Sequence, residues 1–282
     1  MFIKISSHMP QSTVAWRRNW ESKLQFVCGS NLMSSKMFLK RPWNISLLDA
    51  VILKKPILLG VDWNNYEDNP SFYAKSLYKI ILNKKYTHSV RDSYTYKKLK
   101  KLGFNNILNT GCPTMWRLTK EHCSEIPSGK SDAVVFTVTD YRKNEIADNA
   151  LIHALIAEYQ DVYFWPQGNG DIEYFKLLGA NFDYSNINVL SPTLKAFDDV
   201  LEKNIDFIGT RLHAGVRALQ KKRKTTIIAV DNRAIEKKKD FNLPVIERFL
   251  SIPEYIKEFN LDKPLDLEVD FESVNKWKSQ FY

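Results

Sequence analysis

Short apolar segments alternate with longer segments of helical periodicity along most of this sequence, and that alternation restricts the chain to α/β architectures. The pattern is clearest in the second half, where we expect strands over 133–138, 162–165, 187–190, 205–208 and 225–230. Each is apolar along most of its length and is followed by apolar residues at helical spacing. Such runs are typical of strands that are buried on both faces of a parallel sheet. The sequence therefore predicts parallel sheets covered by helices.

The first half of the chain carries a weaker form of the same alternation. Its expected strands lie over 24–28, 56–61, 86–90 and 106–108. A polar stretch at 126–131 contains proline and glycine and is typical of a linker. We therefore predict two facing, doubly wound α/β domains, 1–127 and 128–282, with ligands bound at the carboxyl ends of the strands. The C-terminal segment that contains Trp277 and Phe281 predicts helices that can dock back on the first domain.

The chain is basic, with 41 Lys and Arg residues against 32 Asp and Glu residues and a formal net charge of +9. Its basic runs lie on expected helix faces. Neither zinc-finger spacing, nor a glycine-aromatic RNA motif, nor a basic zipper accompanies them, so we expect no nucleic acid among the partners. The charge is compatible with anionic substrates and with peripheral contact to an anionic membrane surface.

Several classes of protein and site are not expected. No apolar run reaches the roughly eighteen residues that a membrane-spanning helix needs. The three cysteines show no paired spacing, which is typical of a reducing compartment, so we predict a cytoplasmic protein and leave a peripheral position at the inner membrane face open. The histidines lack metal-ligand spacing, so we predict neither a metal nor a cofactor. The pattern predicts no particular oligomeric state.

The segment 209–215, Gly-Thr-Arg-Leu-His-Ala-Gly, places an arginine and a histidine where an expected strand gives way to an expected helix. A strand-to-helix junction directs free backbone N–H groups, and the positive end of the helix dipole, toward the edge of the sheet. Arg211 adds a permanent cation, and histidine, here His213, is the side chain that gains or loses a proton near neutral pH. The junction predicts an anion site with acid–base capability. The alternative is that Arg211 pairs with a surface carboxylate.

Other charged residues follow expected strands in the same way. They are Arg91 and Asp92 after 86–90, Asp171 after 162–165, and Asp231 and Arg233 after 225–230. Each has an alternative interpretation as part of a helix cap or a local ion pair. In that interpretation Asp92 caps its own helix and Arg233 pairs with Glu236.

Five segments, taken in order, resemble the polysaccharide pyruvyltransferase family, whose members move pyruvate from phosphoenolpyruvate onto a sugar. They are SVRDSYTYKKLKKLG at 89–103, GCPTMW at 111–116, WPQGNGD at 165–171, IGTRLHAGVRAL at 208–219 and IIAVDNRAIEKKKDFNLPV at 227–245. The resemblance implies a two-domain fold of the glycosyltransferase-B type. It also implies that Arg211 and His213 bind and activate the donor, with Arg91, Thr210 and Arg233 as further donor-binding candidates.

The chemistry of such a transfer explains the residue types. Phosphoenolpyruvate carries a carboxylate and a phosphate, so its site needs several cations, and arginine suits both groups. We expect His213 to act as general acid and Asp171 to act as base for a sugar hydroxyl. The expected product is a pyruvate ketal on a cell-surface polysaccharide or on its lipid-linked precursor. The expected partners are phosphoenolpyruvate and the sugar acceptor.

The start of the chain departs from the family pattern. Family chains commonly open with a strand and a GN-x-GD loop, but residues 1–18 contain no such motif. We expect the chain to enter the fold near CGSNLMSS at 28–35, with a short or rebuilt first unit on the acceptor side. Two other functions stay open: a sugar-nucleotide-dependent glycosyltransferase of the same architecture, and a non-catalytic relative that takes part in polysaccharide assembly.

Overall fold

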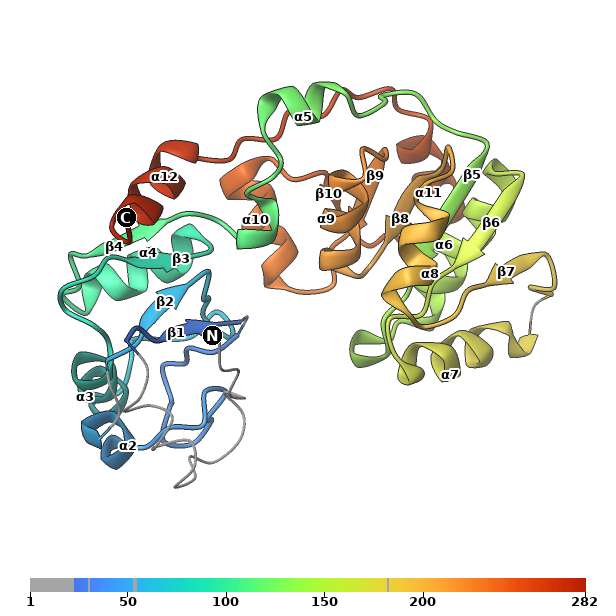
Figure 1. The fold of residues 1–282 in the computed structure, drawn as a ribbon. Helices are drawn as coiled ribbons and strands as arrows, with labels where there is room; N and C mark the ends of the chain where they lie inside the picture. Colours follow the sequence, from blue (N-terminus) through green and yellow to red (C-terminus); the bar gives the residue numbers. More distant parts are fainter. Residues whose placement is uncertain (1–22, 30, 53–54, 182) are drawn as a thin grey trace. The chain divides into compact units, whose positions relative to one another are not determined.

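The computed structural model describes residues 23–29, 31–52, 55–181 and 183–282. The chain divides into two compact units (Figure 1). Unit 1 comprises residues 1–116 together with 269–282, and unit 2 comprises residues 117–268. The division falls before the expected boundary at 127/128 and assigns the C-terminal segment to unit 1. The expectation for residues 1–18 lies outside the described residues.

Unit 1 is built on short parallel strands. They are β1 (Phe26–Cys28), β2 (Ile57–Leu59), β3 (His88–Val90) and β4 (Ile107–Asn109). β1 pairs with β2 and β3 pairs with β4, and a parallel bridge between Val61 and Val90 continues the ladder from the end of β2 to the end of β3. The helices are α2 (Leu47–Ile52), α3 (Phe72–Ile81), α4 (Ser93–Lys101) and α12 (Phe271–Ser279). The carboxyl ends of β1, β2 and β3 therefore lie beside one another.

The C-terminal helix α12 is fixed to unit 1 by aromatic packing and hydrogen bonds. The Trp277 ring contacts Phe26 edge-on with ring centroids 6.2 Å apart, and it packs against Trp116 at 5.8 Å. Its Nε1 donates to the carbonyl oxygen of Thr87 at 2.7 Å. A Trp–Trp–Phe cluster with a satisfied indole N–H is a strong anchor, because large rings bury much apolar area. This explains why a distant segment of sequence completes the first unit.

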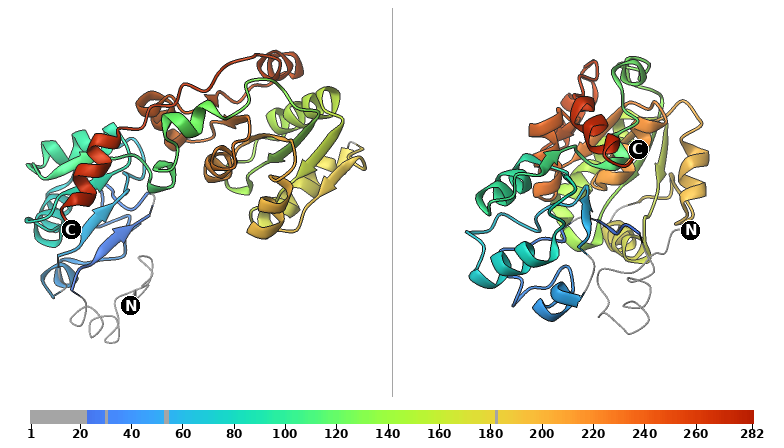
Figure 2. Two further views of the ribbon diagram at one scale, coloured as in Figure 1. Left: turned by 45° about the horizontal axis from the view of Figure 1, so that its top comes forward. Right: turned by 60° about the vertical axis from the view of Figure 1, so that its left-hand side comes forward.

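Unit 2 contains a six-stranded parallel sheet with the order β10-β9-β8-β5-β6-β7. The strands are β5 (Ala133–Thr137), β6 (Asp161–Phe164), β7 (Ile187–Val189), β8 (Asp206–Gly209), β9 (Thr225–Ile228) and β10 (Val245–Ile246). The helices are α5 (Lys120–Ser124), α6 (Glu145–Glu158), α7 (Asn169–Leu178), α8 (Leu194–Val200), α9 (Leu212–Gln220), α10 (Asn232–Phe241) and α11 (Ile252–Phe259). Helices lie on both faces of this sheet (Figure 2).

The strand order of unit 2 determines where its ligand site can form. From β5 the chain proceeds outward to β6 and β7, returns to β8 on the other side of β5, and then proceeds outward to β9 and β10. Right-handed crossovers in opposite directions place their helices on opposite faces, so the loops after β5 and β8 separate there. Ligands of doubly wound sheets bind at this switch point, beyond the carboxyl ends of the strands.

The α/β class with parallel sheets is confirmed, and the differences from the sequence analysis are local. Short elements such as α2, α5 and β10 were not expected, because segments this short carry too few residues for a clear period. The pair Ser191 and Pro192 predicts a helix that starts with Ser191 as its cap and Pro192 in its first turn, but α8 starts later. Thr193 is the N-cap, and its hydroxyl accepts from the backbone N–H of Ala196 at 3.2 Å.

Two glycines of the segment 209–215 are required by close packing. A Cβ atom added at Gly209 would lie 2.6 Å from the backbone nitrogen of Thr137 on the neighbouring strand. A Cβ atom at Gly215 would lie 2.4 Å from a side-chain carbon of Ile227, which shows how closely α9 packs on the sheet. Both distances are far below van der Waals contact, so a side chain at either place would push β8 or α9 outward.

Candidate functional site

The junction between β8 and α9 lies at the switch point of the unit 2 sheet. Thr210 donates its backbone N–H to the carbonyl oxygen of Thr137 at 3.0 Å, and the backbone N–H of Arg211 donates to the Thr137 hydroxyl at 3.2 Å. Arg211 is the N-cap of α9, and no side chain caps this helix. The first-turn N–H groups of α9 are therefore not satisfied by a capping side chain, as an anion site requires.

Arg211 is held by two carboxylates that come from the loops after β5 and β6. Its Nε donates to Asp171 at 3.2 Å, its Nη2 also donates to Asp171, and Nη2 donates to Asp140 at 3.2 Å. The Asp171 side chain is fully buried, whereas the Asp140 side chain is 39% exposed. The alternative of a surface carboxylate thus describes only Asp140. The stronger partner is a buried side chain that fixes the plane of the guanidinium.

Asp171 accepts hydrogen bonds on both of its oxygens. Besides Arg211, the backbone N–H of Asp140 donates to Oδ1 at 3.1 Å and that of Gln167 donates to Oδ2 at 3.0 Å. Gly170 makes room for this arrangement, because a Cβ atom there would collide with the Asp140 carboxylate. The buried charge is compensated by donors from three loops, as a carboxylate in this position needs.

Arg233 reaches the same region through Tyr141. Its Nη2 donates to the Tyr141 hydroxyl at 3.0 Å, and the guanidinium carbons of Arg211 and Arg233 lie 5.0 Å and 6.0 Å from the centre of the Tyr141 ring. The expected alternative pairing of Arg233 with Glu236 is wrong. Arg233 forms its ion pair with Asp231, at 2.5 Å, and Glu236 pairs with Lys239. Burial disfavours a charge on Arg233, but the bonds to Asp231 and Tyr141 outweigh it and raise its pKa.

Three further polar residues belong to this end of the sheet. His213 lies in the first turn of α9 and is exposed, while Thr210 is 2% exposed. Thr139 follows β5 and is fully buried, and within the described part of the chain its hydroxyl has no hydrogen-bond partner. The structure therefore assembles Arg211, Arg233, Thr210 and Asp171 around one edge of the unit 2 sheet. No observation tests the roles assigned to these side chains.

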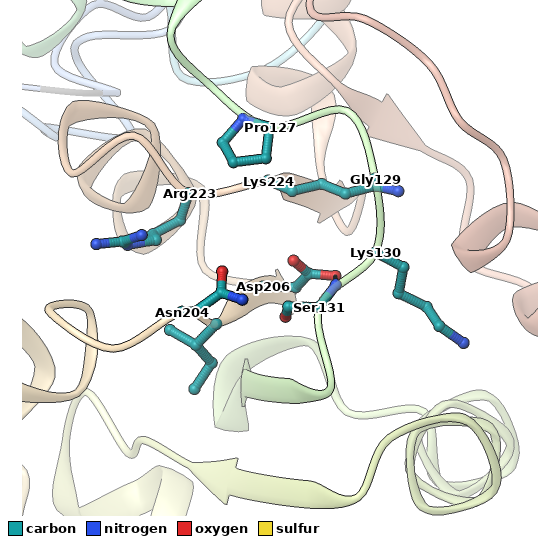
Figure 3. A pocket seen from close by; sticks show the side chains of 9 residues that line it. Pro127, Gly129, Lys130, Ser131, Asn204, Asp206, Arg223 and Lys224 are labelled. Carbon is teal, nitrogen blue, oxygen red and sulfur yellow. Dashed lines mark hydrogen bonds between the residues drawn. The ribbon is translucent and has the colours of Figure 1, made fainter.

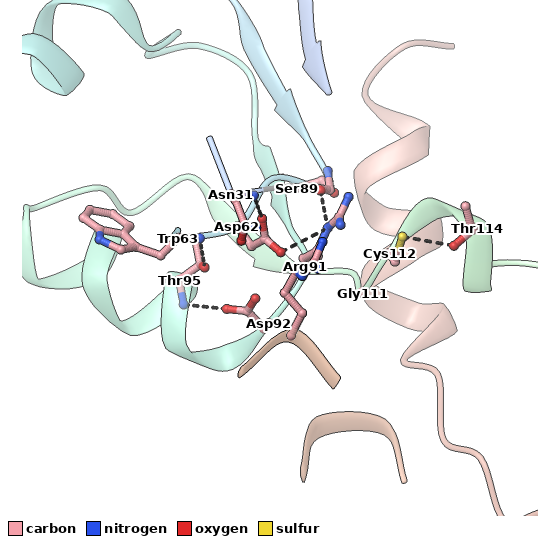
Figure 4. Close-up of polar contacts among 12 residues, drawn as sticks. Asn31, Asp62, Trp63, Ser89, Arg91, Asp92, Thr95, Gly111, Cys112 and Thr114 are labelled. Atoms are coloured by element: carbon pink, nitrogen blue, oxygen red, sulfur yellow. Dashed lines mark hydrogen bonds and ion pairs between the residues drawn. The ribbon is translucent and has the colours of Figure 1, made fainter. Parts of the chain in front are cut away.

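Arg91 lies in unit 1, at the carboxyl end of β3. Its Nε donates to the carbonyl oxygen of Gly60 at 2.6 Å and lies 3.7 Å from Oδ2 of Asp62 (Figure 4). Asp92 caps α4, as its alternative interpretation proposed, by accepting from the backbone N–H of Thr95 at 2.7 Å. Arg91 is only 5% exposed. It is therefore tied into the β2–β3 edge of its own unit.

Sequence reasoning missed three residues of these two regions. Tyr141 and Asp140 follow β5, and Asp62 follows β2, so all three lie beyond the carboxyl end of a strand. The strand-end rule that selected Arg91 and Asp171 applies equally to Asp62 and Asp140, whereas Tyr141 is uncharged and carries no signal under that rule.

A cavity of about 170 Å³ lies at the opposite, amino-terminal edge of the unit 2 sheet (Figure 3). It is lined by Pro127 and residues 129–131, which precede β5, and by Asp206, Arg223 and Lys224. The side chains of Lys130 and Arg223 point away from Asp206 in Figure 3, and Lys130 pairs with Glu158 at 2.7 Å.

The described residues contain no group of three or more His, Cys, Asp and Glu side chains arranged to hold a metal ion. Among them, no helix is both long enough and apolar enough to cross a bilayer.

Comparison with known proteins identifies the family of the chain. The sequence matches the family described as polysaccharide pyruvyl transferase over residues 2–232, which is most of its length. No curated protein matches it significantly. Among solved structures, a match is the E. coli heptosyltransferase WaaC with ADP-2-deoxy-2-fluoro heptose, with 14% identity and a TM-score of 0.39, covering 89% of this chain and 81% of the other. The extent of the family match, which includes both strand-end arginines Arg91 and Arg211, is decisive: this chain belongs to the polysaccharide pyruvyl transferase family.

Proposed function

We propose that this protein transfers pyruvate from phosphoenolpyruvate to a sugar of a cell-surface polysaccharide or its lipid-linked precursor and forms a pyruvate ketal. The observation that carries the proposal is the position of Arg211. It lies at the switch point of the unit 2 sheet, inside the family match, and a buried carboxylate holds its guanidinium in place. A fixed cation beside an uncapped helix N-terminus supports anion binding.

The donor requires more than one cation. Its phosphate carries about −1.5 to −2 charges near neutral pH, and its carboxylate adds one more. Arg211 and Arg233 share the Tyr141 ring, which brings two guanidinium groups to one locus. The first-turn N–H groups of α9 add neutral donors at the same edge. Together they support a site for a small, highly charged anion.

Each of the two arginines already has a carboxylate partner, so the donor must compete with one of them. Asp171 is buried and saturated with donors, and it is the poorer group to displace. Asp140 is 39% exposed and makes a single 3.2 Å contact with Arg211. We propose that the donor replaces Asp140, because an exposed ion pair is worth little while a bound phosphate gains several charge-assisted bonds.

The proposed reaction proceeds in steps that conserve protons. His213 gives a proton to the terminal enol carbon, which leaves a cationic carbon at C2. A sugar hydroxyl attacks C2 and gives its proton to the now neutral His213, the C2–O bond to phosphate breaks, and phosphate leaves with the bonding electrons. A second hydroxyl of the same sugar attacks C2, gives its proton to the departing phosphate and closes the ketal. No oxidant or reductant is involved.

For Asp171 we propose a positioning role. Both of its oxygens accept hydrogen bonds, and its protonation would break the ion pair that holds Arg211. Four donors already occupy these two oxygens, so neither oxygen is free to accept a proton from a sugar hydroxyl. The expected role as base for the sugar hydroxyl stays a prediction that no observation tests. We propose that the carboxylate that contacts the acceptor lies in unit 1.

We also propose that the acceptor is presented at an anionic membrane surface. Unit 1 exposes five large apolar side chains, each between 62% and 85% exposed: Phe38, Leu39, Leu48, Val51 and Phe72. Exposed basic residues, Lys36, Lys40 and Arg41, flank the first two of them in the sequence. Apolar groups combined with basic ones support contact with an anionic lipid surface.

Sedimentation with vesicles tests the membrane proposal. The chain should pellet with phosphatidylglycerol vesicles and not with phosphatidylcholine vesicles, and the double variant F38S/L39S should stay in the supernatant. Leu194→Ser, which changes an exposed leucine of unit 2, is the matched control. Equal sedimentation of the parent and the double variant would show that this segment does not contact the membrane.

A ligand comparison tests the function. Phosphoenolpyruvate should raise the thermal midpoint of the parent protein and fail to do so for Arg211→Ala. UDP-sugars and GDP-sugars should have no effect. Stabilisation by a nucleotide sugar alone would favour a glycosyltransferase, and no response to any of these compounds would favour a non-catalytic member of the family.

A further inference from the structure

A second polar centre lies in unit 1, at the carboxyl ends of its three neighbouring strands. Asn31 follows β1, Asp62 follows β2 and Arg91 follows β3 (Figure 4). The parallel register of β1 with β2, and the bridge between the ends of β2 and β3, bring these side chains together. The backbone N–H of Asn31 donates to Oδ1 of Asp62, which joins the first two residues directly.

Two acceptor oxygens of this centre lack a hydrogen-bond donor. Asp62 is 1% exposed, and no donor within the described part of the chain reaches its Oδ2. The Nε of Arg91 lies 3.7 Å away, which is ion-pair distance and longer than a hydrogen bond. The Oδ1 atom of Asn31 is likewise buried and has no donor within the same ranges. Buried acceptors without donors are rare in folded proteins and indicate a ligand or water that supplies them.

The surroundings hold both oxygens in place. Asn31 has a left-handed backbone, with φ of 57°, a conformation that asparagine adopts more readily than most residues. The backbone after Asp62 is fixed because Trp63 donates its N–H to the Thr95 hydroxyl at 2.9 Å. Arg91 joins the strand ends through the Gly60 carbonyl and the Asp62 carboxylate. The centre is therefore preorganised, which favours binding over collapse.

The charges at this centre determine which ligand fits. Asp62 would repel a phosphate or a carboxylate, and Arg91 beside it would repel an ammonium group. A neutral ligand with two hydroxyl donors satisfies both oxygens without adding charge. Two hydroxyls of one sugar ring are also the groups that ketal formation consumes. On the basis of the proposed function, we infer that Asp62 and Asn31 bind two hydroxyl groups of the acceptor sugar, with Arg91 as a positioning residue.

Sugar binding by the full chain tests the inference directly. The probes are methyl glucopyranoside, methyl galactopyranoside and methyl mannopyranoside at tens of millimolar, followed by saturation-transfer NMR. The parent protein should bind at least one of them, and Asp62→Asn should weaken that binding by about tenfold. Asn31→Gly, which retains the left-handed backbone and removes the amide, should weaken it as well.

The matched control is Asp68→Asn, which removes an exposed carboxylate from the same loop. It should bind the sugar as the parent does. Thermal unfolding of Asp62→Asn checks the fold, and Asn in this place can still accept from the backbone N–H of Asn31. The inference is overturned if the parent binds none of the three glycosides, or if Asp62→Asn and Asn31→Gly bind as tightly as Asp68→Asn.

The donor supplies an independent measurement. Stabilisation by phosphoenolpyruvate should be the same in Asp62→Asn as in the parent, because its proposed site is in unit 2. Loss of sugar binding without any response of the parent to phosphoenolpyruvate would support the sugar centre and contradict the proposed donor. A parent that responds to phosphoenolpyruvate but binds no glycoside would contradict the sugar centre alone.

Discussion

Asp171 in unit 2 and Asp62 in unit 1 both lie beyond the carboxyl end of a parallel strand, and both are buried beside an arginine. Their hydrogen bonding differs. Asp171 accepts from Arg211 and from two backbone N–H groups, and both of its oxygens are used. Asp62 accepts on one oxygen, while within the described ranges its other oxygen has no donor. A saturated carboxylate positions its neighbour, whereas a carboxylate with an unused acceptor is available to a ligand.

The same contrast separates the arginines. Arg211 lies at the N-terminus of α9 and shares the Tyr141 ring with Arg233. This position suits a cation that binds an anion. Arg91 bonds to a carbonyl within its own unit. We therefore propose that donor binding belongs to unit 2 and hydroxyl binding to unit 1. Four measurements can contradict or refine this assignment.

The largest effect on ligand binding is expected at Arg211. Arg211→Ala should weaken phosphoenolpyruvate binding by about 10²-fold, because it removes the central cation and leaves Asp171 as a buried, uncompensated charge. Calorimetric titration measures this. Arg217→Ala is the control, since Arg217 lies on the same helix but pairs with Asp198 at 2.8 Å. Equal losses in both variants would show that the effect is not specific to the site.

The carboxylates should differ in their contribution to stability. Asp171→Asn should lower the free energy of unfolding by about 3 kcal/mol, because an amide cannot balance Arg211 and places a donor against donors. Asp62→Asn should cost less, about 1 kcal/mol, because the Nε of Arg91 keeps its bond to the Gly60 carbonyl and lies 3.7 Å from Oδ2, which is longer than a hydrogen bond. Urea unfolding measures both values. A cost for Asp62→Asn as large as that for Asp171→Asn would make Asp62 a structural residue.

The units should respond differently to acid. In unit 1, burial lowers the pKa of His88 to about 4, and its neutral ring accepts from the backbone N–H of Leu58. The unfolded chain then binds more protons than the folded one between pH 6.5 and 4, so stability falls as pH decreases through that window, by roughly 3 kcal/mol in full. In unit 2, burial raises the pKa of Asp206. The folded state then binds the extra proton, so the contribution of Asp206 to stability increases as pH decreases.

Hydrogen exchange at several pH values separates the two units. Amides of β3 should lose protection between pH 6.5 and 4, while those of β8 should not. His88→Gln should reduce this pH dependence in unit 1. An unchanged dependence in that variant would mean that another group in unit 1 titrates.

The smallest effect is expected at Tyr141. Tyr141→Phe removes the 3.0 Å hydrogen bond to Arg233 and keeps the ring that both arginines share. We expect a loss of about 1 kcal/mol or less in phosphoenolpyruvate binding. Tyr141→Ala should lose more, because it also removes the ring. Equal effects of the two variants would assign the whole contribution to the hydroxyl.

Local sequence patterns were sufficient for the elements of this fold. The apolar run of β5 and the helical period of α6 are properties of neighbouring residues, so they can be recognised without knowing the fold. The same holds for Arg211, because a strand followed by a helix is visible in 205–219 alone. Short elements such as β10 were missed, because two residues carry no period.

The hydrogen-bond and ion-pair partners of these side chains could not be predicted from the local sequence. The alternative interpretation paired Arg233 with Glu236 on its own helix. Arg233 instead turns back to Asp231, and Tyr141 comes from a loop more than ninety residues away. That loop follows β5, which lies beside β8 only because the chain returns across the sheet. Strand order depends on long-range packing, and no local period encodes it.

The sequence by itself determined the α/β class, the family and the strand-end position of the basic residues, because these follow from periodicity and from short motifs. Only the tertiary structure decided which carboxylate is satisfied. Asp62 and Asp171 are indistinguishable as sequence signals, since each is an acidic residue after an apolar strand. They differ because the neighbouring strands bring four donors to Asp171 and leave one oxygen of Asp62 without any within the described residues.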